Sequence, residues 1–323
     1  MTTPIEEISN SIQRQTLRIA NEVDKAGYTG LGIQEETITD ILLNGVQSEH
    51  EENFFTRKFT RKEEGNITGA DWLWCIGEPG SWITFAVQAK IANMNTGRIN
   101  YLHYRGGEQY SLLIKFSKLF GFIPKYSIYA KVEKEIELFS RVVPDLKNIP
   151  PEQWSFTAIS PKYIKQLSTP NERHLSSVLQ FAVPWAYVFC AEKYKNAKLA
   201  EVIANNLENI YWSFDNEYRQ RREQDSRFSY ERMVWENPQP SKMISESIPL
   251  PILYLMTQNS FPHKVPISNV SVLSRIPVHH ALKLELAKIE SSRQWKNFPR
   301  VFERKLENIQ SSERTYMVPH GRW

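Results

Sequence analysis

Hydrophobic residues recur at helical spacing along the first part of the chain. From position 5 to position 23, isoleucine and valine recur at helical spacing among polar neighbours, at 5, 8, 12, 19 and 23, which predicts an amphipathic helix over residues 4–26. Pro4 suits the first turn of this helix. The same spacing returns after a glycine-containing segment and predicts a second helix over residues 34–46.

The period of the pattern then shortens to that of β-strands. Runs of aromatic and β-branched residues alternate with turn residues, and Glu78-Pro-Gly80 predicts a hairpin. Strands are predicted over residues 53–61, 70–77, 82–91 and 124–132, with a helix over 107–120. The resulting order is helix, three strands, helix, strand, which indicates an α/β fold with an additional N-terminal helix.

The second half has a less regular pattern. Prolines at 144, 150 and 151 predict a boundary between a core of residues 1–145 and a mostly helical region of residues 146–323. Helices are predicted over 193–212 and 278–289, and strands or short helices over 183–190 and 248–256. The role of this region stays open.

Composition excludes several classes of protein. Nine Trp, fourteen Tyr and sixteen Phe supply enough apolar surface to exclude general disorder. The longest near-continuous apolar run, residues 248–256, contains two prolines and is shorter than the ~20 residues of a membrane span. The acidic N-terminus lacks the features of a secretory signal, and two cysteines do not build a disulfide framework. We therefore expect a cytoplasmic protein with no membrane partner.

Positive charge is concentrated near the C-terminus. The chain carries 40 basic and 36 acidic residues, a net charge of +4, and residues 281–323 alone have nine basic and five acidic residues. Arg300, Arg304 and Lys305 are the candidate contacts to nucleic-acid phosphates in this segment. The alternative is a solvated face of an amphipathic helix.

Three polar residues lie on the predicted hairpin. Asp71 is early in one strand, and Gln88 and Lys90 share one face at the end of the next strand. A lysine after an apolar run needs an anion nearby, and Asp71 is the natural candidate. Carboxylate, amide and carbonyl oxygens together suit Mg²⁺. An ion pair at the end of the sheet is the structural alternative.

This pattern, Asp-x(16)-Gln-x-Lys on a hairpin that follows an acid-bearing helix, resembles the restriction-endonuclease-like superfamily of PD-(D/E)xK nucleases. The Gln-x-Lys form is similar to the Mrr-like branch, and the wider segment resembles an uncharacterised bacterial family of that fold. The resemblance implies that Asp71 binds the metal, Gln88 is a weakened ligand and Lys90 is catalytic. Ala70 replaces the proline of the family pattern.

The acid on the predicted second helix has two candidates. The resemblance favours Glu36 as a catalytic residue and metal ligand, whereas helix geometry places Glu35 closer to the apolar face. Gln109, in the first turn of the predicted helix over 107–120, is a secondary candidate that could reach the same cleft.

These observations favour a metal-dependent nuclease that hydrolyses DNA with Mg²⁺ or Mn²⁺. The resemblance implies a bacterial role in defence against foreign, including viral, DNA. A catalytically silent module that binds nucleic acid or protein is the first alternative, and RNA cleavage is another. Further copies of the chain or another component of a defence system are the protein partners considered.

Overall fold

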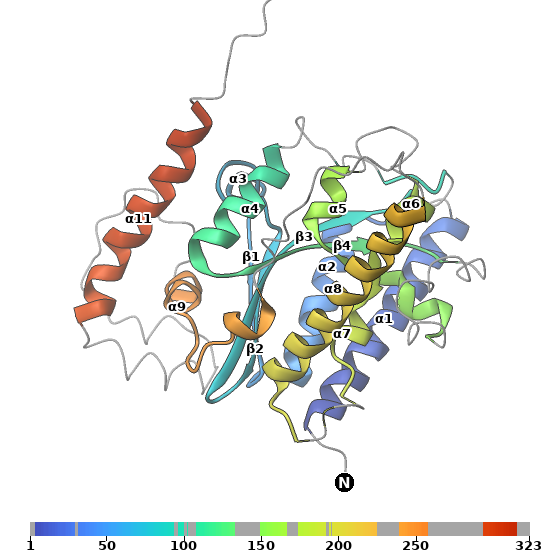
Figure 1. Ribbon diagram of the computed structural model, residues 1–323, viewed down its shortest axis with the longest axis horizontal. Coiled ribbons are helices and arrows are strands. Elements are labelled where there is room, and N and C mark those ends of the chain that lie inside the picture. The colour runs from blue at the N-terminus through green and yellow to red at the C-terminus, as the bar shows by residue number, and fades with distance from the viewer. Residues whose placement is uncertain are drawn as a thin grey trace, which may run out of the picture.

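The structure is a computed structural model in which one mixed β-sheet carries helices on both faces (Figure 1). It describes residues 4–29, 32–93, 96–99, 102, 108–132, 149–166, 174–191, 194, 196–224, 239–257 and 293–314. Within these residues the sheet has six strands in the order β1-β2-β3-β4-β5-β6. The α/β class predicted from the sequence is therefore confirmed.

All neighbouring strands of this sheet are antiparallel except β3 and β4, which are parallel. The strands are β1 (Phe54–Lys58), β2 (Trp72–Glu78), β3 (Ser81–Ile91), β4 (Ile123–Tyr129), β5 (Phe156–Ile159) and β6 (Ala182–Pro184). Parallel neighbours need a crossover connection, and the helix α4 (Glu108–Phe120) lies in the connection between β3 and β4.

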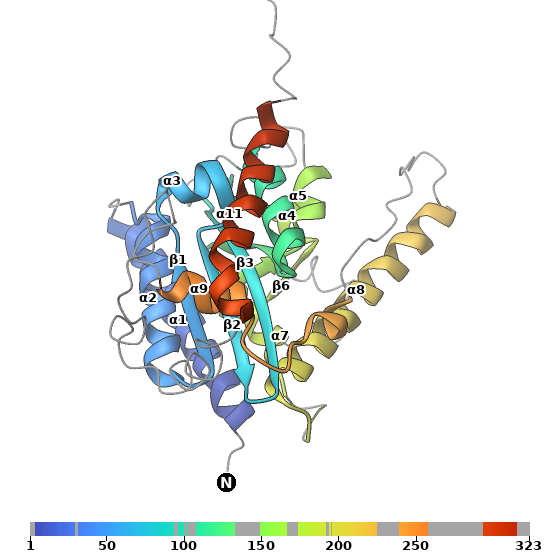
Figure 2. The same cartoon turned by 90° about the vertical axis from the view of Figure 1, so that its left-hand side faces the viewer.

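The helices form two layers around the sheet (Figure 1). One layer contains α1 (Pro4–Thr29), α2 (Glu35–Glu49), α7 (Trp185–Val188) and α8 (Leu199–Gln224). The other contains α3 (Arg61–Glu63), the π-helix η1 (Glu64–Thr68), α4, α9 (Leu250–Thr257) and α11 (Arg293–Arg314). Figure 2 shows α11 in front of the sheet, beside α4 and α9. The shorter helices are η5 (Pro151–Ser155), α5 (Pro161–Gln166), α6 (Leu175–Leu179) and η7 (Pro240–Met243).

The central strands are buried on both faces, because helices cover both sides of the sheet. Every residue of β3 except Ile91 is buried. On the α7–α8 side, the ring of Trp185 lies 5.5 Å from that of Trp74 and 5.4 Å from that of Phe85. Strands covered on both faces have nearly continuous apolar sequences, which explains why the apolar run in β3 does not alternate.

The order of helix, three strands, helix and strand matches the prediction, but the connection between β1 and β2 does not. The strand predicted over 53–61 ends at Lys58, and the chain forms α3 and η1 before β2 begins. Thr60 is the reason. Its Oγ1 accepts a hydrogen bond from the backbone N–H of Glu63 at 3.3 Å, and its own N–H donates to the Glu63 carboxylate at 2.7 Å. This capping box begins a helix where extended chain was expected.

The boundary predicted near residue 145 does not separate two hydrophobic cores. Strand β5 follows the prolines and pairs with the edge of β4, and β6 pairs with β5, so the sheet continues into the second half. The buried hydrophobic residues of both halves form one cluster.

The elements predicted in the second half have mixed outcomes. The helix predicted over 193–212 is observed as α8, the segment 183–190 contains β6 and α7, and the segment 248–256 lies largely in α9. The helix predicted over 278–289 lies outside the described residues.

Candidate functional site

Asp71 is held at the start of β2 by bonds to both neighbouring strands. Its backbone N–H donates to the carbonyl of Val87 at 2.8 Å, and its carbonyl accepts from the N–H of Phe59 at 2.7 Å. Its Oδ2 accepts from the backbone N–H of Ala89 at 2.5 Å and from Nε2 of Gln88 at 2.6 Å. The carboxylate is thus tied to the strand that carries Gln88 and Lys90.

Gln88 and Lys90 project from one face of β3, as their spacing predicted, and both are buried. Ala89 lies between them and faces the opposite side of the sheet, and its backbone N–H donates to Asp71. Burial raises the pKa of the Asp71 carboxyl well above its usual range, and the negative charge of Glu35 raises it further. The positive charge of Lys90 acts in the other direction.

Glu35, the first residue of α2, belongs to this group. Burial raises the pKa of Glu35 to about 7, although Lys90 and a hydrogen bond from the backbone of Ile91 lower it. Glu64 and Glu36 add repulsion. Glu35, Asp71 and Lys90 therefore interact electrostatically. Among the salt bridges of the described residues, none joins Lys90 to either acid.

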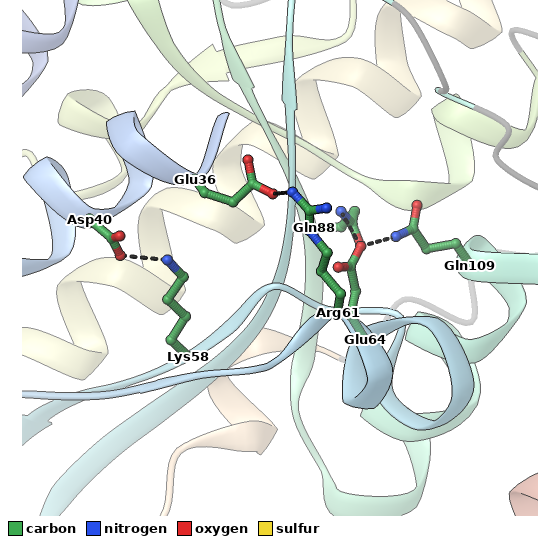
Figure 3. Close-up of polar contacts among 7 residues, drawn as sticks. All are labelled: Glu36, Asp40, Lys58, Arg61, Glu64, Gln88 and Gln109. Atoms are coloured by element: carbon green, nitrogen blue, oxygen red, sulfur yellow. Dashed lines mark hydrogen bonds and ion pairs between the residues drawn. The ribbon is translucent and has the colours of Figure 1, made fainter. Parts of the chain in front are cut away.

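Glu36 points to a different neighbour. Its Oε1 lies 2.7 Å from Nη2 of Arg61 (Figure 3); the Arg61 side chain is exposed and that of Glu36 is about half-exposed. A hydrogen bond from its own backbone N–H and one from Arg61 lower the pKa of Glu36. Of the two acids left open by the sequence, Glu35 is the one that interacts with Asp71 and Lys90, and Glu36 forms an ion pair with α3.

The third carboxylate of the site belongs to Glu64, the first residue of η1, which sequence reasoning did not select. Oε1 of Glu64 accepts from Nε2 of Gln88 at 3.3 Å and from Nε2 of Gln109 (Figure 3). Gln109 is buried in the first turn of α4, so this secondary candidate does reach the site. The signal that could have identified Glu64 is the capping box Thr60-x-x-Glu63, since it predicts a helix start immediately before this acid.

Gly69 allows η1 to lie against α4. It ends the π-helix with φ of 62°, a left-handed conformation that glycine adopts without strain. A Cβ at this position would lie 2.3 Å from the carbonyl oxygen of Gln109 and 2.3 Å from the backbone nitrogen of Leu113. The missing side chain therefore lets η1 approach α4, and Glu64 lies beside Gln109.

The donor set at this site suits a hard cation. Three carboxylates, those of Glu35, Glu64 and Asp71, interact electrostatically, and Lys90 acts on Glu35 and Asp71. Glu64 also interacts with Arg61. Oε1 of Gln88 and Oε1 of Gln109 are buried and accept no hydrogen bond from the described part of the chain. No three His, Cys, Asp or Glu side chains among the described residues lie close enough to hold a metal by themselves. A bound Mg²⁺ would therefore need amide or carbonyl oxygens beside the carboxylates.

The cationic residues predicted on the C-terminal helix have different environments. Arg300 and Arg304 are exposed on α11. Nζ of Lys305 instead donates to the carbonyl of Leu119 at 3.3 Å and lies 5.6 Å from the centre of the Phe120 ring. Lys305 thus helps to attach α11 to α4, which leaves Arg300 and Arg304 on the solvent side.

Comparison with known proteins gives a family without an assigned function. Residues 8–279 match a family described as "Family of unknown function (DUF6615)". No curated protein matches the chain. In the part of the chain that the structure describes, no helix combines the length and the apolar character that crossing a membrane requires.

Proposed function

The chain belongs to the family of unknown function DUF6615, and we propose that it is a metal-dependent nuclease that hydrolyses DNA phosphodiester bonds. The finer fold proposal is a restriction-endonuclease-like core. Its elements would be α2, the strands β1 to β3, α4 and β4, with β5 and β6 extending the sheet. The order of these elements, and the parallel pairing of β3 with β4, support this proposal.

One observation carries the proposal. Sixteen residues separate Asp71 from the Gln88-x-Lys90 segment, and Oδ2 of Asp71 bonds to Gln88 and to the backbone of Ala89 in that segment. Glu35 approaches the same group from a helix. Such convergence of acids, amide and lysine at one end of a sheet is unnecessary for packing, because buried carboxylates cost folding free energy unless a cation or proton compensates them.

The chemistry follows from the placement of each group. Asp71 and Glu35 would hold the divalent cation, with Gln88 as a neutral and weaker ligand. A bound Mg²⁺ or Mn²⁺ neutralises charge on the attacked phosphate and activates water at neutral pH. Lys90, which is buried beside both acids, would orient the water or stabilise charge on the phosphate oxygens.

The substrate proposal is DNA, with RNA as the alternative. Arg300 and Arg304 on α11 would contact the phosphate backbone away from the cleaved bond, because they are exposed on a helix that packs beside α4 and η1. A role in bacterial defence against foreign DNA in the cytoplasm is part of this proposal. It rests on the resemblance of the site pattern, and a defence partner or a second copy would be compatible with it.

A second candidate function is a silent nuclease-fold module that binds nucleic acid or protein. The favouring observation is the amide of Gln88, which donates to both Asp71 and Glu64. These bonds compensate part of the buried negative charge without a metal. The nuclease and the silent module differ in one measurable respect: only in the nuclease does Lys90 contribute to the rate of DNA cleavage.

The deciding experiment compares the wild type with Lys90→Ala on plasmid, linear and single-stranded DNA and on RNA, with Mg²⁺ present. We expect cleavage to fall by about 10²- to 10³-fold, the typical effect of removing one electrostatic stabiliser. Lys25→Ala is the control, because its ammonium pairs with Glu22 at 3.0 Å on an exposed part of α1, a different helix from those of the site. Undiminished cleavage in Lys90→Ala would contradict the mechanism, and absence of cleavage by the wild type would favour the silent module.

Metal binding is tested separately. Asp71→Asn should weaken Mn²⁺ binding measured by calorimetry while the circular dichroism spectrum stays unchanged. The reason is that the variant removes a charge but keeps the shape of the side chain. Unchanged Mn²⁺ affinity in this variant would remove Asp71 from the site.

A further inference from the structure

The side-chain amide of Gln88 has more hydrogen-bond acceptors around it than it has hydrogens to donate. Its Nε2 carries two hydrogens but lies within bonding distance of three acceptors: Oδ2 of Asp71 at 2.6 Å, the carbonyl of Ala89 at 3.1 Å and Oε1 of Glu64 at 3.3 Å. Its Oε1 is buried and has no partner among the described residues. Acceptors therefore outnumber donors around a fully buried side chain.

Gln109 also has an unused acceptor, and it bonds to the same oxygen of Glu64. Its Nε2 also donates to Oε1 of Glu64, whereas its own Oε1 is buried without a partner among the described residues. The side chain is 6% exposed and that of Gln88 is 0% exposed. Two buried glutamine side chains thus meet at one carboxylate oxygen, each with an unused acceptor.

We propose that Glu64, Gln88 and Gln109 form a second divalent-cation subsite, next to the one formed by Asp71 and Glu35. Amide oxygen and nitrogen are interchangeable by rotation of the side chain, so both glutamines can present Oε1 to a cation bound by Glu64. Carboxylate and amide oxygens are ligands that Mg²⁺ and Mn²⁺ accept. One cation would satisfy both unused acceptors and compensate the third carboxylate.

The position of Glu64 distinguishes this subsite from the first. Glu35 comes from α2 and is bound by the backbone of Ile91, whereas Glu64 comes from η1 and is bound by α4 through Gln109. Gln88 lies between them, bonded to both Asp71 and Glu64. The π-helical turn places Glu64 here, and such turns are frequent at functional sites.

The role of the subsite rests on the proposed nuclease function. Sites with two cations hold both the attacking and the leaving oxygen of a transferred phosphoryl group. A second subsite would therefore explain why acids approach Asp71 from α2 and from η1. The binding of the cation itself, however, does not depend on that function and is measured without a substrate.

The test counts Mn²⁺ ions bound to the full chain, with Mn²⁺ alone as the probe, by calorimetry and by the electron paramagnetic resonance signal of free Mn²⁺. We expect two ions in the wild type and one in Glu64→Gln. Glu108→Gln is the matched control and should still bind two ions, because Glu108 is exposed beside Gln109 on the same helix. Gln109→Leu should weaken one of the two sites by about 10- to 100-fold, the usual effect of losing a supporting group.

Thermal melts in EDTA separate this subsite from a structural role of Glu64. We expect Glu64→Gln to keep or raise the melting temperature, because it removes one carboxylate from a crowded anionic group. A lower melting temperature with an unchanged Mn²⁺ count would overturn the proposal. One ion bound equally by the wild type and Glu64→Gln would also overturn it but leave the nuclease proposal standing. No Mn²⁺ binding by the wild type would contradict both proposals.

Discussion

Replacing Glu35 by Gln should stabilise the cation-free protein, and by more at alkaline than at acidic pH. Burial raises the pKa of Glu35 from 4.5 to about 7, so the folded protein binds a proton here that the unfolded chain has released. Between these two pH values the native state holds more protons, and wild-type stability therefore falls as pH rises through this window. Each pKa unit corresponds to about 1.4 kcal/mol, which gives about 3 kcal/mol at most.

Glutamine cannot ionise, so the stability of Glu35→Gln should not fall with rising pH as that of the wild type does. The difference in unfolding free energy between variant and wild type should grow by about 2 to 3 kcal/mol between about pH 5 and about pH 8. Urea unfolding in EDTA at both pH values measures it, since EDTA removes any cation that would compensate the acid. The variant should become the more stable protein at the higher pH.

Glu36→Gln is the matched control, and it should lower the unfolding free energy where Glu35→Gln raises it. The pKa of Glu36 is lowered by its own backbone N–H and by Arg61, so its contribution is present above pH 4.5 and disappears as pH falls further. Because the Arg61 pair is exposed, the loss in Glu36→Gln should be below about 1 kcal/mol. If the two variants changed stability in the same direction at about pH 8, the assignment of Glu35 to the buried acid group would be refuted.

Three further predictions concern other parts of the structure. Burial lowers the pKa of Lys125 to about 7, so the unfolding free energy of the wild type should rise between about pH 7 and pH 10.5, by at most about 5 kcal/mol. Urea unfolding of Lys125→Met should show no such rise. Gly69→Ala should lower the melting temperature clearly, because a Cβ meets the α4 backbone at 2.3 Å; an unchanged value would argue against the contact of η1 with α4. Reversing the charges of Arg300 and Arg304 should lower the slope of log affinity for duplex DNA against log salt by about 0.9 per lost contact, and an unaltered slope would assign both to a solvated face.

The sequence alone was sufficient for the order of the main elements from α2 to β4 and for the hairpin residues of the site. Strand β3 is rich in apolar residues, and period-two geometry puts Gln88 and Lys90 on one face whatever surrounds them. Asp71 follows from the pairing of consecutive strands, since the turn at Glu78-Pro-Gly80 leaves little choice of register. These are local properties, which depend on neighbouring residues and backbone geometry.

The tertiary structure decided what depends on contacts between distant segments. The choice between Glu35 and Glu36 depends on how α2 is rotated against the sheet, and adjacent helix residues differ by about 100° around the axis. Glu64 joins the site only because Gly69 lets η1 lie against α4, and β5 joins the sheet only because β4 offers an open edge. Helix rotation, close approach and edge pairing are set by the packing of segments far apart in the chain, which a local pattern of hydrophobic and polar residues does not contain.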